Sequence, residues 1–179
     1  MILLRSSGLA AALGGALWIL RAVLDGRRAP ETGGLADAAF FIVPLLLLAG
    51  LGGLYVLYGD RLAGLGHAGF SQGFIGLGML AVGLFGEFTL GFEGAGRLSS
   101  LGFLVLALGM VLLGYGSFSK EPFPRFNSLP LVIGIAVPLD LLVGEIPWAR
   151  IAVSALFGIG WVLLGYLIWQ ARPPDEERS

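Results

Sequence analysis

The sequence predicts an all-α integral membrane protein, a polytopic bundle of six transmembrane helices. Hydrophobic residues make up 56% of the chain and charged residues 13%, whereas soluble domains carry roughly 25% charged residues. Apolar stretches recur along the whole chain, and most approach the roughly 20 residues that a helix needs to cross a bilayer. The chain also holds 30 glycines, and small residues let helices pack closely in lipid.

The first two apolar stretches cover about 4–24 and 37–59. The first begins near Arg5 and resembles a signal peptide, but no clear small-x-small cleavage site follows it. We therefore interpret it as a retained membrane anchor. Pro44 lies inside the second stretch and predicts a kink there.

The third and fourth stretches cover about 67–90 and 98–118. The third carries a glycine at about every third to fifth residue, and it has Glu87 near its end and Glu93 in the loop that follows. It begins at His67, the single histidine of the chain, which we expect at the membrane interface. Ser99 and Ser100 stand where the first amides of the fourth helix need partners.

The fifth stretch, about 128–146, gives the weakest signal because Pro138 and Asp140 interrupt it. The sixth stretch, about 148–170, has Trp148 and Trp169 near its ends, as expected of aromatic belts at membrane interfaces. Residues 1–171 thus form the six-helix domain, and residues 172–179 form a polar tail.

The distribution of basic residues predicts the orientation. Six spans place both termini on one side, which then holds six of the 11 Lys and Arg residues, leaving five on the other side. This small excess favours cytoplasmic termini. Ten arginines against one lysine, together with abundant Ala, Gly and Leu, are typical of a GC-rich bacterial genome, so we expect the bacterial inner (plasma) membrane.

A faint internal repeat indicates three copies of a two-helix hairpin. Residues 109–115 and 160–166 share the pattern Gly-x-Val-Leu-Leu-Gly-Tyr. A second alignment relates the first span to the third through two glycine pairs: Gly8 with Gly69 and Gly15 with Gly76. The alternative is coincidence in a sequence built mostly from Gly, Leu, Val, Ala and Phe.

The small residues predict close helix packing. Pairs with small-xxx-small spacing are Gly69 with Gly73, Ala11 with Gly15, and Ala12 with Ala16. We expect such faces to pack mainly within the chain. Formation of a homo-oligomer, or binding to another membrane protein through these faces, is the alternative; the bilayer itself is the expected surrounding.

Ionisable residues inside a membrane are costly and raise the question of function. Arg21, Glu87 and Asp140 are predicted near the same depth, close to the ends of three odd-numbered spans. Glu93 and Glu145 fall in loops on that side. We expect a mixed-charge vestibule on the non-cytoplasmic side, which binds a cation or small polar ligand with Arg21 as counter-ion. The alternative is that Arg21 pairs with Glu87 or Asp140 and merely joins helix ends, or that each of these side chains extends to water.

Several chemistries are excluded or disfavoured. The chain has no cysteine, which removes disulfides and thiolate metal sites. One histidine cannot supply a bis-histidine haem or a two-His zinc site. A net charge of −1 gives no electrostatic basis for nucleic-acid binding. No catalytic residue, cofactor or metal site is predicted.

Residues 25–29 resemble part of the CDP-alcohol phosphotransferase motif. Ala22 and Pro30 stand where that motif needs an aspartate and an arginine, so the resemblance is rejected. The sequence therefore favours a small non-enzymatic membrane protein: a transporter-like or channel-like module, or a subunit of a membrane complex. The alternatives are a membrane enzyme that uses carboxylates at the vestibule, and a purely structural or regulatory partner.

Overall fold

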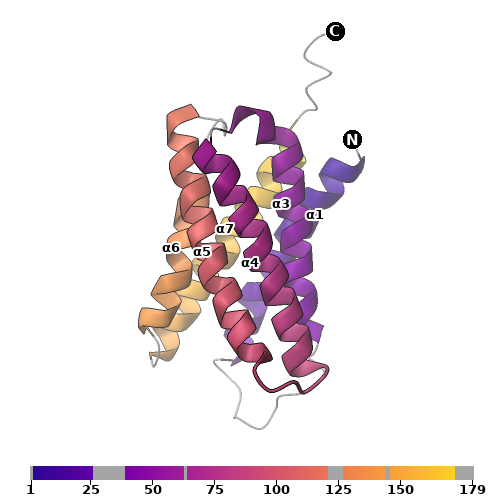
Figure 1. Ribbon diagram of the computed structural model, residues 1–179, viewed down its shortest axis with the longest axis vertical. Coiled ribbons are helices and arrows are strands. Elements are labelled where there is room, and N and C mark those ends of the chain that lie inside the picture. The colour runs from indigo at the N-terminus through magenta and orange to yellow at the C-terminus, as the bar shows by residue number, and fades with distance from the viewer. Residues whose placement is uncertain (1, 26–38, 63, 121–126, 144–145, 172–179) are drawn as a thin grey trace.

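The computed structural model describes residues 2–25, 39–62, 64–120, 127–143 and 146–171. Within these ranges the chain is all-helical, which confirms the predicted fold class. The helices are α1 (Ile2–Asp25), η1 (Ala39–Phe41), α3 (Ile42–Tyr58), η2 (Gly59–Arg61), α4 (Gly64–Phe88), α5 (Ala95–Lys120), α6 (Leu129–Val143) and α7 (Pro147–Gln170). The α-helices run up and down along the long axis of the molecule (Figure 1).

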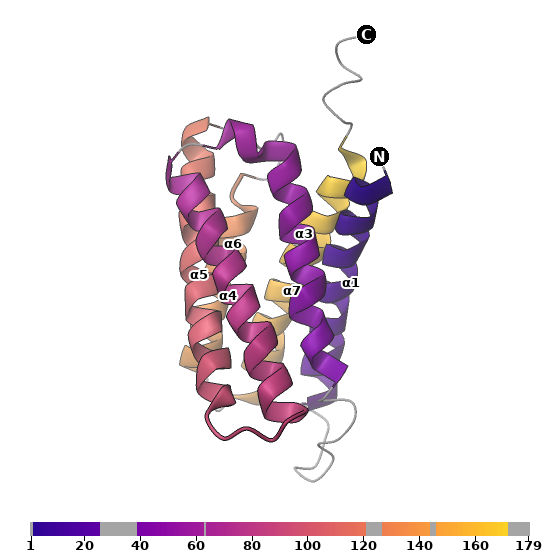
Figure 2. The ribbon, with the colours of Figure 1, turned by 45° about the vertical axis from the view of Figure 1, so that its right-hand side comes forward.

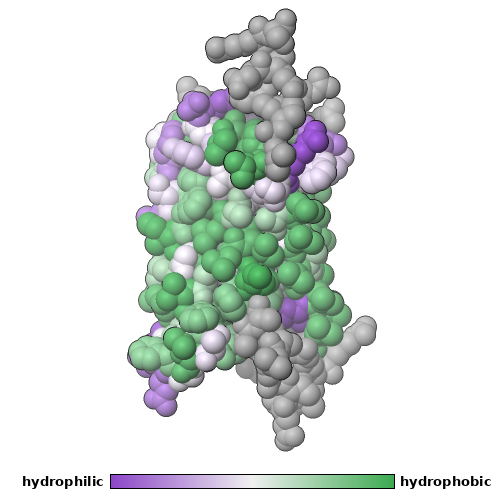
Figure 3. Space-filling view, turned by 90° about the vertical axis from the view of Figure 1, so that its right-hand side faces the viewer, coloured by the Kyte–Doolittle hydropathy of each residue, from purple (hydrophilic) through white to green (hydrophobic). Residues whose placement is uncertain are grey.

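Five of the described helices, α1, α3 together with η2, α4, α5 and α7, are long and apolar enough to cross a membrane. Their outer faces expose large hydrophobic side chains such as Leu13, Val82 and Leu108. Figure 3 shows an apolar belt around the middle of the visible face, with hydrophilic residues toward its ends. The protein is therefore a multi-pass membrane protein whose surface suits contact with lipid.

The sixth helix, α6, is shorter than the sequence predicts. It has 15 residues and is therefore about 22 Å long, less than the roughly 30 Å of hydrocarbon. Pro138 lies inside this helix without ending it. Just beyond the end of α6, the Ile146 amide donates a hydrogen bond to the Val143 carbonyl at 2.9 Å.

The predicted kink at Pro44 rests on a span that starts too early. The second long helix, α3, begins at Ile42, so Pro44 falls in its first turn rather than in its interior. A proline there removes an amide that has no partner within the helix, and its fixed φ suits the helix start.

The helices form a closed ring. Each helix packs against the next along the chain, from α1 to α3, α4, α5, α6 and α7, and α7 returns to pack closely against α1. Figures 1 and 2 both show α1 and α7 side by side although they lie at opposite ends of the chain. Large fully buried side chains fill the interior: Leu47, Leu51, Leu77, Leu106, Met110, Ile133 and Trp161.

Glycines set the distance between α1 and α7. Gly8 lies opposite Gly165, and Gly15 lies opposite Gly158, two helical turns along. A Cβ atom added to Gly8 would stand 2.7 Å from the Gly165 carbonyl oxygen, and one added to Gly158 would stand 2.6 Å from the Gly15 carbonyl oxygen. The two backbones thus touch, and only glycine fits at these positions.

The α4–α5 pair repeats this arrangement. Gly69 lies opposite Gly109, and Gly76 lies opposite Gly102. A Cβ atom added to Gly69 would stand 2.6 Å from the Gly109 carbonyl oxygen, and one added to Gly76 would stand 2.7 Å from the Gly102 carbonyl oxygen. The expectation that these glycines serve packing within the chain is confirmed.

The contacts also bear on the internal repeat. Gly8 and Gly69 have equivalent roles, as do Gly15 and Gly76, each facing a glycine of an antiparallel neighbour. The matched segments 109–115 and 160–166 differ: an added Cβ at Gly109 meets α4, whereas one at Gly160 meets Ile133 of α6. Moreover, one of the two closest pairs, α1–α7, is not a hairpin. The packing thus agrees with the alignment of the first span with the third, and not with the alignment of 109–115 with 160–166.

Candidate functional site: the charged end and an apolar pocket

The charged end of the bundle is built where α4 turns into α5. The amide of Phe92 donates to the Gly86 carbonyl at 2.9 Å and holds the loop against the end of α4. Gly91 and Gly94 have φ angles of 62° and 99°, in the region that side-chain-bearing residues rarely adopt. These two glycines let the chain reverse within a short loop.

This loop surrounds an open depression of about 400 Å³, whose polar lining comes from Glu87, Glu93 and Arg97. All three side chains are exposed. Within the described residues none of them forms an ion pair at 4.0 Å or less. The depression therefore presents two carboxylates and one guanidinium to the aqueous edge of the bundle.

Glu87 has a structural contact as well. Its two carboxylate oxygens lie 3.3 Å from the point where a Cβ of Gly96 would stand, so the carboxylate rests against the first turn of α5. The amino end of a helix carries partial positive charge and favours a carboxylate there. This contact favours an acidic side chain at this position.

Arg21 lies in the last two turns of α1 and is partly buried. Its guanidinium carbon stands 4.2 Å from the ring centroid of Phe40 in η1 and 5.5 Å from that of Phe88 at the end of α4. A guanidinium within about 6 Å of an aromatic ring is attracted to the ring electrons. Arg21 thus joins the ends of three helices through aromatic rings.

The structure brings part of the expected vestibule together. Glu87 and Glu93 line one depression, but Glu87 forms no ion pair within the described part of the chain, so it is not the carboxylate partner considered for Arg21. Asp140 belongs to α6, but its side chain lies outside the description, and Glu145 lies outside the described residues. A role for these five residues in ligand binding stays a prediction.

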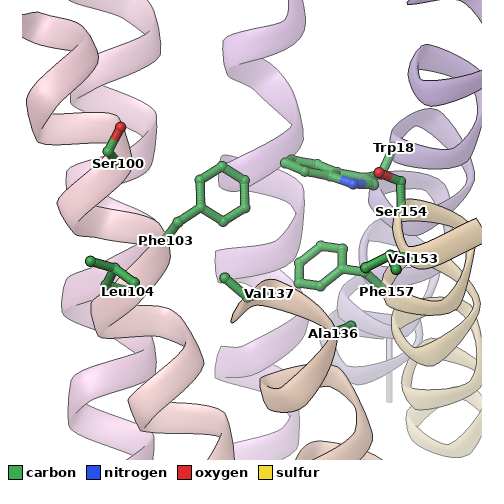
Figure 4. A pocket seen from close by; sticks show the side chains of 9 residues that line it. All are labelled: Trp18, Ser100, Phe103, Leu104, Ala136, Val137, Val153, Ser154 and Phe157. Carbon is green, nitrogen blue, oxygen red and sulfur yellow. The ribbon is translucent and has the colours of Figure 1, made fainter. Parts of the chain in front are cut away.

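A second hollow lies inside the bundle, between α1, α5, α6 and α7. It measures about 190 Å³, and three aromatic rings line it: Trp18, Phe103 and Phe157 (Figure 4). The Trp18 ring stands 5.2 Å from that of Phe103 in an edge-to-face arrangement and 5.0 Å from that of Phe157. Such offset aromatic packing is favourable and keeps the rings in fixed positions.

The rest of the hollow is aliphatic apart from two hydroxyl groups, on Ser100 of α5 and Ser154 of α7. Ser100 Oγ donates to the Gly96 carbonyl at 3.0 Å. Aliphatic side chains complete the lining: Leu104, Ala136, Val137 and Val153. This pocket cannot be recognised from the sequence, because its residues are scattered over four helices and each is an ordinary membrane-helix residue.

The fold and these two features define a multi-pass helical membrane protein with an apolar core and a charged depression at its α4–α5 end. Among the described residues, no group of three or more His, Cys, Asp or Glu side chains is placed to hold a metal ion. Comparison of the chain with models of protein families, with curated proteins and with solved structures found no match.

Proposed function

We propose that this chain is a small non-enzymatic membrane protein that binds a small polar ligand or cation at its charged end. It would act as a transporter-like or channel-like module, or as a subunit of a membrane complex. The observation that carries this proposal is the open depression at the α4–α5 junction, in which the exposed carboxylates of Glu87 and Glu93 stand beside Arg97.

The proposal includes a cellular location and an orientation in the membrane. The apolar helices support residence in a membrane, and we assign the chain to the bacterial plasma membrane with both termini in the cytoplasm. α1 begins and α7 ends at one end of the bundle, and the α4–α5 loop lies at the other (Figure 1). With this orientation the charged depression faces the outside of the cell.

The interior supports binding at the end of the bundle over passage through it. Among the described residues, the buried polar side chains are Ser99 and Ser117. Both hydroxyls donate to carbonyls of their own helix, Ser99 to Ala95 at 3.4 Å and Ser117 to Leu113 at 2.7 Å. A polar solute would thus meet an apolar core, which favours a binding module or a subunit that needs a partner.

Two alternatives from the sequence remain beside this proposal. A carboxylate-based enzyme would need Asp140 or Glu145 to join Glu87 at the charged end. Assembly with a second copy or another membrane protein would need a lipid-facing surface. The faces of Gly69 and Gly15 are already occupied within the chain, whereas Ala16 stays exposed on α1.

Titration of the purified protein in lipid nanodiscs with ethanolamine tests the proposal, because its ammonium group suits the carboxylates and its hydroxyl can bind Arg97. We expect Glu87→Gln and Glu93→Gln each to weaken binding about three- to tenfold, as expected for loss of a charge-assisted hydrogen bond. Asp60→Asn is the matched control, because Asp60 is an exposed carboxylate at the opposite end. Equal affinity in all three variants would refute the proposal.

A further inference from the structure

We propose that the pocket between α1, α5, α6 and α7 binds a small neutral aromatic molecule with one hydrogen-bonding group, such as a phenol. This site lies inside the bundle and does not depend on the charged end. Its volume of about 190 Å³ exceeds the roughly 150 Å³ that holds benzene in an apolar protein cavity. It therefore accepts one ring with a small substituent.

The lining determines the class of ligand. The rings of Trp18, Phe103 and Phe157 present flat apolar surfaces on which another ring packs favourably. None of the described residues that line the pocket is charged, and burial of a charge without a partner is strongly unfavourable. A neutral ring is thus preferred over an aromatic cation or carboxylate.

The hydroxyl groups supply the polar contact. Ser154 Oγ has no hydrogen-bond partner among the described residues, and Ser154 lines the pocket together with Trp18 (Figure 4). Ser100 Oγ donates to its own helix, but its remaining lone pair can still accept a hydrogen bond. Figure 4 shows the two serines on opposite sides of the pocket, so a phenolic hydroxyl beside Ser154 would give that serine its hydrogen-bond partner.

The position of the pocket indicates how a ligand enters. On the α5 side the lining residues Ser100 and Leu104 are exposed, Leu104 at 47%, and this side of α5 also exposes Leu101 and Leu108. These leucines face lipid in a membrane. A molecule already dissolved in the bilayer therefore reaches the pocket from the side, past α5.

The test uses 4-bromophenol, a one-ring phenol whose bromine quenches tryptophan fluorescence on contact. Wild-type protein in nanodiscs should show saturable quenching, and this component should be lost in Ala136→Phe, because the added ring occupies the pocket. Ala152→Phe introduces the same ring at an exposed position of α7 and should leave binding unchanged. Ser154→Ala should weaken binding about two- to tenfold through loss of one hydrogen bond.

Each contrary result would overturn the proposal. Quenching that never saturates would show simple partitioning into lipid. Equal binding in Ala136→Phe and Ala152→Phe would place the ligand elsewhere, and tighter binding of benzyltrimethylammonium would contradict a neutral ligand. If Ala136→Phe does not fold, the comparison of wild type with Ser154→Ala decides, because a serine-to-alanine change at this partly buried position preserves the packing.

Discussion

At the scale of single residues, Arg21 shows how a charge is accommodated near the end of a membrane helix. The side chain is partly buried, and its guanidinium carbon lies closer to the Phe40 ring than to the Phe88 ring, at 4.2 Å against 5.5 Å. The face of an aromatic ring attracts a guanidinium, and the ring itself is compatible with apolar surroundings. Arg21 can therefore hold α1 to η1 and to the end of α4.

We predict that Arg21 and Phe40 are energetically coupled. A double-mutant cycle with Arg21→Met and Phe40→Leu should give a coupling free energy of about 0.5–2 kcal/mol, the range for a guanidinium near an aromatic ring. Reversible unfolding in detergent would measure it. The same cycle with Phe88→Leu should give a smaller value because that ring is farther away. Zero coupling with Phe40 would show that the contact is only incidental.

The sequence places Arg21 near the end of a helix but does not reveal its aromatic contacts. A carboxylate is the partner that the sequence suggests most readily, since opposite charges attract at long range and are easily recognised. The aromatic contacts depend on how the ends of α1, η1 and α4 meet. Phe40 and Phe88 resemble the other ten of the 12 phenylalanines until the helices are packed.

At the scale of elements, the glycines pair particular helices. In both α1–α7 and α4–α5, two glycines on one helix face two on the other, two turns apart. Close approach of backbones gives dispersion contacts, which stabilise helix pairs in lipid where the hydrophobic effect does not. The spacing of the glycines predicts close packing between helices, but it does not tell which helix each glycine meets.

Two glycines of α4 provide a matched test of this packing. Gly76→Ala should lower the free energy of unfolding by about 1–3 kcal/mol, because its Cβ would overlap the backbone of α5. Gly78→Ala meets nothing within 4 Å and should instead raise it by about 0.5–1 kcal/mol through better helix propensity. Both values can be measured by unfolding in mixed micelles. Similar values for both variants would contradict the packing.

At the scale of the whole molecule, the membrane topology depends on whether the short helix α6 carries the chain across the membrane. Five described helices are long enough to cross the membrane, and α6 is not. Yet α6 packs between α5 and α7 and completes the ring, so the chain still reverses direction there. The sequence indicated a weak fifth span at this place, but the actual ends of the helix depend on its neighbours.

We predict that both ends of the chain report the same compartment. Fluorescent reporters fused before α1 and after α7 should both be active in the cytoplasm, since six passes return the chain to its starting side. If α6 did not carry the chain across, five passes would place the reporters on opposite sides. A reporter in the α4–α5 loop is the internal control and should report the opposite side from α1.

The pairing of α1 with α7 has a consequence for biosynthesis. The α4–α5 pair joins neighbours in sequence, so it can assemble as soon as both helices have left the ribosome. The glycine face of α1, with Gly8 and Gly15, meets its partners Gly158 and Gly165 only after α3 to α6 and then α7 have been made. α1 is therefore made and inserted into the membrane well before its partner α7. A chain cut short before α7 would leave this face uncovered and recognisable to quality-control proteases.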